Sequence, residues 1–539
     1  MTNPDQAPGA QNEQASRQPV SAGGRGPRGL TRRALDGMFW TFSGTGVQVV
    51  FRLLSLMALG RLLTPAEFGL VGAVMVVVAL SETVSQIGVG PAIVQRQNLE
   101  QVHVRVAVTL SCTLGLVLGA AVWFNASAIA GFYRIPEVEP LLRGAAFLFP
   151  IDGLSTVGKS LLIRNLRFRL YVALDVASYI IGFATISVLL AWYGLGAWAL
   201  MLAYLAQAML RAMAMYLATR HSVLPSGNLK AAGDLLSFGF GHSLAQIGTV
   251  LSQQGDNFVV GRWLGPAALG VYGRAYNLMV MPAYAFGKVV NRVLFPIMSQ
   301  VQDQRDRLAR GYERALAVVA LVSLPVGAFL WVVAPEFVLL VLGPAWGAVV
   351  LPFRLLTISL LFRMSSRISD ACAKAAGVVY RRALLQGMYA GAVVLGAIAG
   401  QRWGVAGVAV AVSGAMALNW LSMAWLGRGV TGLSWSQFAR AHIPAGFLAV
   451  LIGAAAVAAA QGARAAHLGQ HWTFFAAALA SAGAAYGAVR LLPDLFLGQH
   501  GRWAYQQGSN LIRRNSRRAV RRDAVSPDHL ASAREPNSQ

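Results

Sequence analysis

Apolar residues dominate this chain in runs that recur along nearly its whole length. Examples are VGAVMVVVAL (71–80), ALAVVALVSLPVGAFLWVV (315–333) and GVAGVAVAVSGAMAL (404–418). A helix that crosses a bilayer needs about 20 mostly apolar residues. The pattern therefore predicts an all-α integral membrane protein with about fourteen transmembrane helices, or about twelve if the last pair lies in the interface. The predicted spans are 37–59, 68–90, 105–124, 138–158, 172–192, 196–218, 236–259, 268–288, 313–333, 346–366, 383–400, 404–426, 442–460 and 472–494.

The order of the spans predicts two six-helix bundles followed by an extra helix pair. The expected segments are a disordered cytoplasmic tail (1–33), an N-terminal bundle (34–218), a cytoplasmic linker (219–235), a C-terminal bundle (236–426), the extra pair (427–494) and a basic cytoplasmic tail (495–539). Gly, Ser, Pro and Gln dominate both tails, which is typical of disorder.

Composition supports this class and locates the charge. Hydrophobic residues make up 56% of the 539 residues and charged residues only 12%. The net charge of +24 collects in the tails and in alternate connections. Those connections and their helix ends hold about twenty Lys and Arg, against about six in the other connections. Because basic residues stay on the cytoplasmic side, we expect both termini to lie in the cytoplasm, and we expect no nucleic-acid partner.

A thirteen-residue stretch recurs with seven identical positions. GRLLTPAEFGLVG (60–72) and GRWLGPAALGVYG (261–273) lie 201 residues apart and follow the first and seventh predicted helices. Each predicted unit has six helices, an even number, so both units enter the membrane from the same side. The expected internal symmetry is therefore parallel, with its axis along the membrane normal. We call each of these two stretches a corner motif. Gly and Pro suit a tight reversal of the chain, so each motif is predicted to form a helix–turn–helix corner on the outer side.

Polar residues repeat with the same offset. Thr41, Thr45, Gln48, Arg52 and Ser55 share one helix face, and their counterparts 201 residues later are His242, Gln246, Thr249, Gln253 and Asp256. Two related polar stripes predict a common hydrated lumen. Polar side chains can instead hold helices together.

Basic residues form a second pattern in the C-terminal half. Arg274, Asn277, Met281, Tyr284, Lys288 and Arg292 share one helix face, and Arg363 and Arg367 lie on a later helix. The cations are interpreted either as a lumen lining or as side chains that snorkel from helix ends. We predict substrate binding by Arg52, Arg274, Lys288, Arg292, Arg363 and Arg367, and name Glu82 and Asp256 as candidate coupling or gating residues. Arg211 with an Asp, or Arg354 with a Glu, can also form a structural pair.

Catalytic signatures are missing from the sequence. It contains no GxSxG, HExxH or CxxC, and only two cysteines, Cys112 and Cys372. We expect a transporter and not an enzyme, with no cofactor and no metal site.

Several stretches resemble a known family. These are GRLLTPAEFGLVG, SQIGVGPAIVQRQNL (85–99), LLIRNLRFRLYVALDVASYIIGF (161–183) and GDNFVVGRWLGPAALGVYGRAYNLMVMPAYAFGKVVNRVLFPIMSQVQ (255–302). The chain is similar, over about residues 30–460, to the polysaccharide-transporter branch of the multidrug/oligosaccharidyl-lipid/polysaccharide flippase superfamily, which includes Wzx-type and colanic-acid-type exporters. This implies two six-helix bundles around a central lumen.

The resemblance also implies a function. It is translocation of undecaprenyl-diphosphate-linked oligosaccharide to the outer leaflet of the bacterial inner membrane for exopolysaccharide, capsule or O-antigen synthesis. A polysaccharide polymerase and export machinery are implied as further partners. The alternatives are a cation-coupled multidrug exporter, a flippase for lipid-linked peptidoglycan precursors and a non-transporting scaffold of a polysaccharide assembly complex. The sequence indicates neither the glycan nor the coupling ion.

Overall fold

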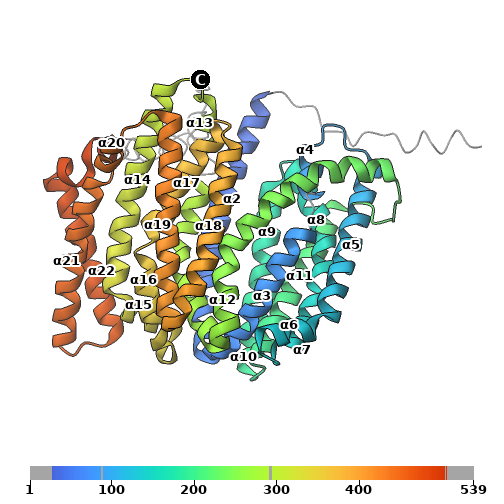
Figure 1. The fold of residues 1–539 in the computed structure, drawn as a ribbon, viewed down its shortest axis with the longest axis horizontal. Helices are drawn as coiled ribbons and strands as arrows, with labels where there is room; N and C mark the ends of the chain where they lie inside the picture. The colour runs from blue at the N-terminus through green and yellow to red at the C-terminus, as the bar shows by residue number, and fades with distance from the viewer. Residues whose placement is uncertain (1–26, 86–88, 290–293, 504–505, 507–539) are drawn as a thin grey trace, which may run out of the picture. The chain divides into compact units, whose positions relative to one another are not determined.

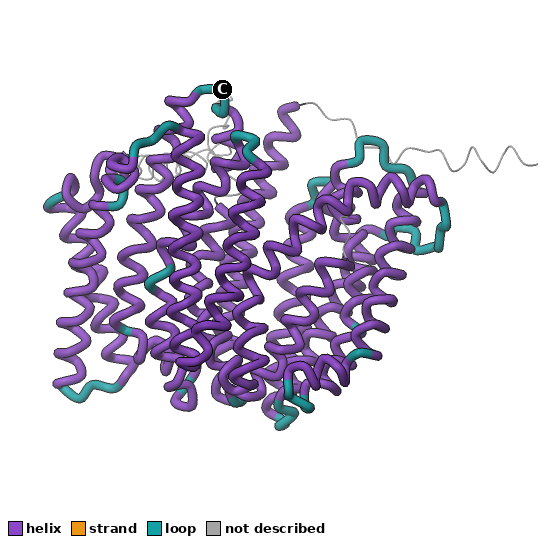
Figure 2. The backbone as a smooth tube through the Cα atoms, in the orientation of Figure 1, coloured by secondary structure: helices purple, strands orange, loops and turns teal. Residues whose placement is uncertain are grey.

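The structure is a computed structural model that describes residues 27–85, 89–289, 294–503 and 506. Every regular element in the described residues is helical, and the connections between helices are short (Figures 1 and 2). The fold class predicted from the apolar runs is confirmed: this is an all-α, multi-pass membrane protein.

The described residues divide into two compact units. The first comprises Met1–Val289, Ala334–Arg363 and Val378–Met423, and the second Val290–Val333, Met364–Gly377 and Ala424–Gln539. The helices α17 (Leu360–Ala375) and α19 (Gly404–Thr431) contribute to both units. These boundaries differ from those of the predicted six-helix bundles, whose limits at 34, 218, 236 and 426 remain a prediction.

The first unit begins with eleven consecutive elements, which run up to the long helix α12 (Leu229–Val289). They are α2 (Pro27–Leu62), α3 (Pro65–Ser85), α4 (Val89–Gln95), α5 (Gln101–Phe124), α6 (Ala126–Tyr133), α7 (Val138–Ala146), α8 (Leu148–Arg164), α9 (Phe168–Ser178), the π-helix η2 (Tyr179–Thr185), α10 (Ile186–Trp192) and α11 (Ala197–Thr219). The later elements of this unit are α15 (Ala334–Leu342), the 3₁₀-helix η4 (Pro344–Val349), α16 (Val350–Thr357), α18 (Val379–Gly400) and the 3₁₀-helix η5 (Gln401–Trp403).

The second unit contains the remaining helices. They are α13 (Phe295–Gln300), α14 (Arg305–Val332), α20 (Trp435–Arg440), α21 (Ile443–Ala465) and α22 (Gln470–Leu491). Buried Leu448 and Ile452 of α21 pack with Leu321 and Phe329 of α14. Tyr312 shares a buried 2.8 Å hydrogen bond with Ser369, so a polar contact adds to this apolar core.

Fewer helices meet the length and hydropathy required of a membrane span than the sequence predicts. Among the described residues, nine helical segments are long and apolar enough to cross a membrane. A tenth is reached if Pro344–Thr357 and Leu360–Ala375, bent by 45°, form one span. The described residues of each predicted span are nevertheless helical, apart from short breaks such as Phe147. The count of fourteen therefore remains a prediction.

Both corner motifs are helix–turn–helix corners. In the first, α2 ends at Leu62 and α3 begins with Pro65. Thr64 and Glu67 form a reciprocal cap: the Thr64 backbone N–H donates to Glu67 Oε2 at 2.7 Å, and the Glu67 N–H donates to Thr64 Oγ1 at 3.3 Å. In the second, Gly265 (φ 85°, ψ −178°) breaks α12 just before Pro266. The predicted reversal is confirmed in each copy.

The two corners also contact each other. A Cβ added to Gly69 would lie 1.7 Å from the carbonyl oxygen of Pro266, and one added to Gly270 would lie 1.8 Å from that of Pro65. Because Gly69 and Gly270 are equivalent in the repeat, as are Pro65 and Pro266, the contact is reciprocal. Such reciprocity is what a local two-fold axis produces, as the predicted parallel repeat requires. At this close crossing α3 packs against α12, and Leu269 lies next to Gly72.

Candidate substrate cavity

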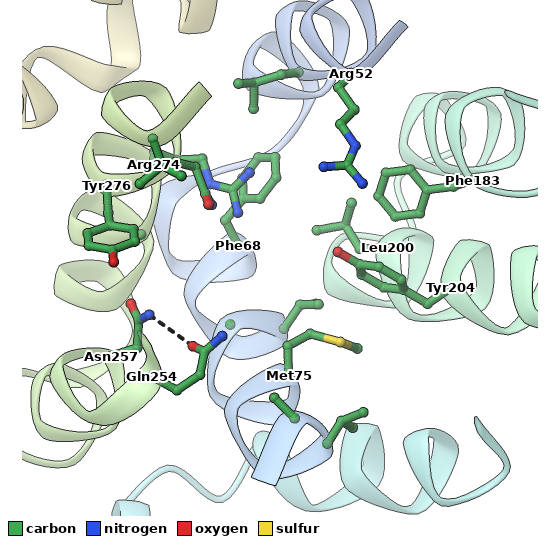
Figure 3. A pocket seen from close by; sticks show the side chains of 18 of the residues that line it. Arg52, Phe68, Met75, Phe183, Leu200, Tyr204, Gln254, Asn257, Arg274 and Tyr276 are labelled. Carbon is green, nitrogen blue, oxygen red and sulfur yellow. Dashed lines mark hydrogen bonds between the residues drawn. The ribbon is translucent and has the colours of Figure 1, made fainter. Parts of the chain in front are cut away.

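A cavity of about 680 Å³ lies inside the first unit. Its walls come from α2, α3, α8, η2, α11 and both halves of α12, with Arg363 from the start of α17 (Figure 3). The volume is within the range of about 300–1,000 Å³ that is common for small-molecule sites. Apolar side chains form much of the wall, and the polar ones are few enough to be considered in turn.

The polar stripes on α2 and α12 reach this cavity in part. Arg52 and Ser55 line it from α2, and Gln253 lines it from α12. Gln48 and Thr249 are half-buried and are not among the lining residues. The side chains of the remaining stripe residues lie outside the described part of the chain; these are Thr41, Thr45, His242 and Gln246.

Asp256 does not face the cavity. It is 1% exposed and accepts a 2.6 Å hydrogen bond from Tyr272 Oη and a 2.8 Å bond from the Asn257 backbone N–H. Two donors satisfy the carboxylate where it is buried, which connects the two halves of α12. A coupling or gating role for Asp256 remains a prediction.

Arg274 faces the cavity from the second half of α12. Its guanidinium carbon lies 4.5 Å from the centroid of the Phe68 ring of α3 (Figure 3). Phe68 in turn meets the edge of the buried Trp346 ring at 5.3 Å. Arg274 Nε is buried and has no hydrogen-bond partner among the described residues. The side chain is thus held by an aromatic ring while a polar atom lacks an acceptor.

Two other cavity arginines are also held on aromatic rings. Arg52 lies over Tyr179 at 5.6 Å, and Arg363 lies over Tyr276 at 5.2 Å and donates a 2.7 Å hydrogen bond to the Tyr276 hydroxyl. Tyr179 belongs to η2, a π-helix of a kind that often occurs at functional sites. A ring attracts a cation through its quadrupole but carries no net charge. The rings therefore set the positions of the three guanidinium groups without adding a negative charge.

A fourth arginine is neutralised. Arg211 of α11 forms a 2.5 Å ion pair with Asp152 of α8, and both line the cavity together with Glu82 of α3. The sequence suggested a pair between Arg211 and an Asp but did not identify Asp152 as its partner. An ionisable residue in an apolar segment was the available signal. Four arginines against two carboxyl groups leave the described cavity wall net positive.

The remaining predicted cations are not placed at the cavity. The Lys288 side chain and all of Arg292 lie outside the described residues. Arg367 is exposed on the part of α17 that belongs to the second unit, and it is not among the lining residues. Where the basic face of α12 is described, Arg274, Asn277 and Met281 all line the cavity; substrate binding by its cations remains a prediction.

Side-chain amides are a further component, and they were not recognised in the sequence. Five of them line the cavity: Gln207, Gln253, Gln254, Asn257 and Asn277. Asn257 Nδ2 donates to Gln254 Oε1 at 3.0 Å (Figure 3). Gln253 and Asn277 stood on predicted faces, but nothing in the sequence indicated that α11 and both halves of α12 would present amides to the same space.

Comparison with known proteins gives consistent matches. Residues 58–351 match the profile of a family described as polysaccharide biosynthesis protein. The lipopolysaccharide biosynthesis protein WzxC of Escherichia coli is 26% identical over 62% of this chain and 68% of its own length. The succinoglycan biosynthesis transport protein ExoT of Rhizobium meliloti is 29% identical over 53% of this chain and 58% of its own. The match therefore spans little more than half of ExoT.

Solved structures share the fold at low sequence identity. The lipid II flippase MurJ in an inward closed conformation superposes with a TM-score of 0.69 at 14% identity, over 84% of this chain and 99% of that one. A multidrug resistance transporter of the MATE family in an inward-facing conformation has a TM-score of 0.55 at 18% identity, over 71% and 95%. These likenesses establish the architecture and leave the cargo open.

Proposed function

Because the chain belongs to the polysaccharide biosynthesis protein family, whose profile covers residues 58–351, we propose that it is a flippase for lipid-linked oligosaccharide. The proposed cargo is an oligosaccharide on undecaprenyl diphosphate, which the protein moves from the inner to the outer leaflet of the bacterial inner membrane. The names of WzxC and ExoT, a lipopolysaccharide biosynthesis protein and a succinoglycan transport protein, support this class of cargo.

The observation that carries the proposal is the set of arginines seated on aromatic rings. Arg52, Arg274 and Arg363 face one cavity, and each is seated against an aromatic ring. Moving a diphosphate through hydrocarbon without help would cost tens of kcal/mol. Charge-assisted hydrogen bonds of about 1.5–3 kcal/mol each can offset part of that cost and still permit release.

A multidrug exporter is the second function that the fold allows. A cationic drug requires unpaired carboxylates, whereas Asp152 is paired with Arg211 and the cavity has more arginines than acids. The charge therefore favours an anionic cargo. A lipid-linked peptidoglycan precursor has the same diphosphate, so the arginines do not distinguish it from a polysaccharide precursor.

The decisive experiment is transport in proteoliposomes. Fluorescent lipid-linked oligosaccharide is placed in the inner leaflet and its appearance outside is measured with wild-type protein, Arg274→Ala and Arg274→Lys. We expect Arg274→Ala to slow transport by at least tenfold and Arg274→Lys to restore it in part, because Lys supplies the charge without the fork. Met281→Leu, at another lining position, is the matched control and retains transport.

Two results would contradict the proposal. Equal transport by Arg274→Ala and wild type, at matched protein levels, would exclude the cationic site. No transport of the lipid-linked sugar by wild type would favour a scaffold role in a polysaccharide assembly complex.

The orientation in the membrane follows from the basic connections. We propose that both termini are cytoplasmic and both corner motifs lie outside. Single-cysteine variants Ala66→Cys and Ala267→Cys are expected to react with an impermeant maleimide in intact cells. Labelling of either one only after the cells are opened would refute the parallel arrangement.

A further inference from the structure

Five carboxamides converge on one cavity from separate segments. Gln207 comes from α11, Gln253, Gln254 and Asn257 from the first half of α12, and Asn277 from its second half. We call these five residues the carboxamide wall. Asn277 lies one helical turn after Arg274, so the wall begins beside an arginine assigned to the diphosphate.

Most of the wall does not hold helices together. Polar side chains inside membranes often bond across helices. Asn257 instead donates to Gln254 within α12 itself. Gln207, Gln253 and Asn277, by contrast, make no side-chain hydrogen bond to the described residues. Donors and acceptors with no protein partner at a cavity surface are available to water or to a ligand.

The chemistry of the wall selects among the parts of the cargo. A carboxamide presents two donors and an acceptor with two lone pairs. A phosphate at neutral pH accepts hydrogen bonds and matches arginine. An isoprenoid tail neither donates nor accepts hydrogen bonds. A sugar hydroxyl both donates and accepts, so a face of carboxamides matches a glycan better than either of the other two parts.

We propose that the carboxamide wall is a glycan subsite, which binds the sugars next to the diphosphate and makes the protein favour a glycosylated lipid over the bare lipid diphosphate. This rests on the proposed function and divides its cavity into two parts: the arginines bind the diphosphate and the amides bind the sugar. The cavity of about 680 Å³ suits a headgroup with its first sugars.

Two probes separate the parts. One is undecaprenyl diphosphate without sugar, and the other is the lipid-linked oligosaccharide that accumulates in cells depleted of this protein. Binding of each is measured with purified protein in nanodiscs for wild type, the double variant Gln253→Leu, Asn277→Leu, and Arg274→Ala. Met281→Leu is the matched control, because Met281 lines the cavity one turn beyond Asn277 without a polar group.

We expect the double variant to lose at least tenfold in affinity for the glycosylated probe and to bind the bare diphosphate as wild type does. Equal loss for both probes, or no loss for either, would overturn the glycan subsite. Failure of the proposed function looks different: wild type would then bind neither probe, or Arg274→Ala would bind both unchanged. If the double variant does not fold, Asn277→Leu alone is expected to show a smaller loss confined to the glycosylated probe.

Discussion

The two corner motifs share seven of thirteen residues, and the structure shows where identity of sequence means identity of role. The prolines open a helix in both copies, and the glycines at 69 and 270 make the same reciprocal contact across the local two-fold axis. At these positions the residue is needed for the backbone conformation or for close backbone packing. Because the backbone is related by the two-fold axis, both copies need the same residue.

At another position, different residues begin the second helix of the corner. Thr64 starts α3 by bonding Glu67, whereas its counterpart Gly265 has φ 85° and ψ −178° and makes a sharper break. This region of backbone space is essentially restricted to glycine. One copy thus uses a side-chain cap and the other uses backbone freedom.

A third position has the same residue in two different roles. Arg61 donates to the backbone oxygens of Met57 at 2.6 Å, Leu340 at 2.9 Å and Val341 at 3.3 Å. Arg262 stacks over the Phe132 ring at 5.1 Å and the Trp263 ring at 5.5 Å, and its buried Nε has no partner in the described residues. The residue type was repeated, but the neighbours that determine its role were not.

The largest predicted effect concerns the crossing. Gly69→Ala and Gly270→Ala should each destabilise the protein by about 1–3 kcal/mol or more, because the new Cβ would overlap a carbonyl oxygen. Gly72→Ala and Gly273→Ala are matched controls, since the nearest atom to a Cβ at each position is 3.5 and 4.0 Å away. The controls should be neutral or slightly stabilising. Thermal unfolding in detergent measures all four, and equal melting temperatures would refute the close crossing.

The next effect tests the two ways of starting a helix. Gly265→Ala should cost about 1–3 kcal/mol, since alanine is strained at that backbone conformation. Thr64→Ala should cost about 1 kcal/mol through loss of the cap, and Thr64→Gly only a few tenths. Measuring the unfolding of the three variants under the same conditions ranks their losses of stability. A larger loss for Thr64→Gly than for Gly265→Ala would contradict this difference between the copies.

The smallest predicted effect compares the two arginines. Arg61→Ala removes three hydrogen bonds, but the site is largely exposed, so we expect a loss of about 1 kcal/mol. Arg262→Ala removes aromatic contacts and should cost about 0.5–1 kcal/mol. The two differ more clearly in their response to lysine: Arg61→Lys loses the fork that reaches several carbonyls, whereas Arg262→Lys retains a cation over the rings. Similar destabilisation by both lysine variants would mean that the two arginines act alike.

Features that depend on local pattern could be predicted from the order of residues alone. Apolar runs predicted the helices, Gly and Pro predicted both corners, and the offset of 201 residues related the two halves. The face of α12 that carries Arg274, Asn277 and Met281 was also predictable, because helical periodicity places residues three or four apart on one side.

The partners of each helix face, by contrast, could be identified only from the packing of the helices. Periodicity could not show that Arg274 would lie on Phe68, that Arg211 would pair with Asp152, or that Asp256 would turn away from the cavity to Tyr272. Nor could it collect the carboxamide wall from α11 and both halves of α12. Spacing along the chain determines direction around a helix axis, whereas partners from distant segments depend on how the helices pack, and that is determined by contacts across the whole unit.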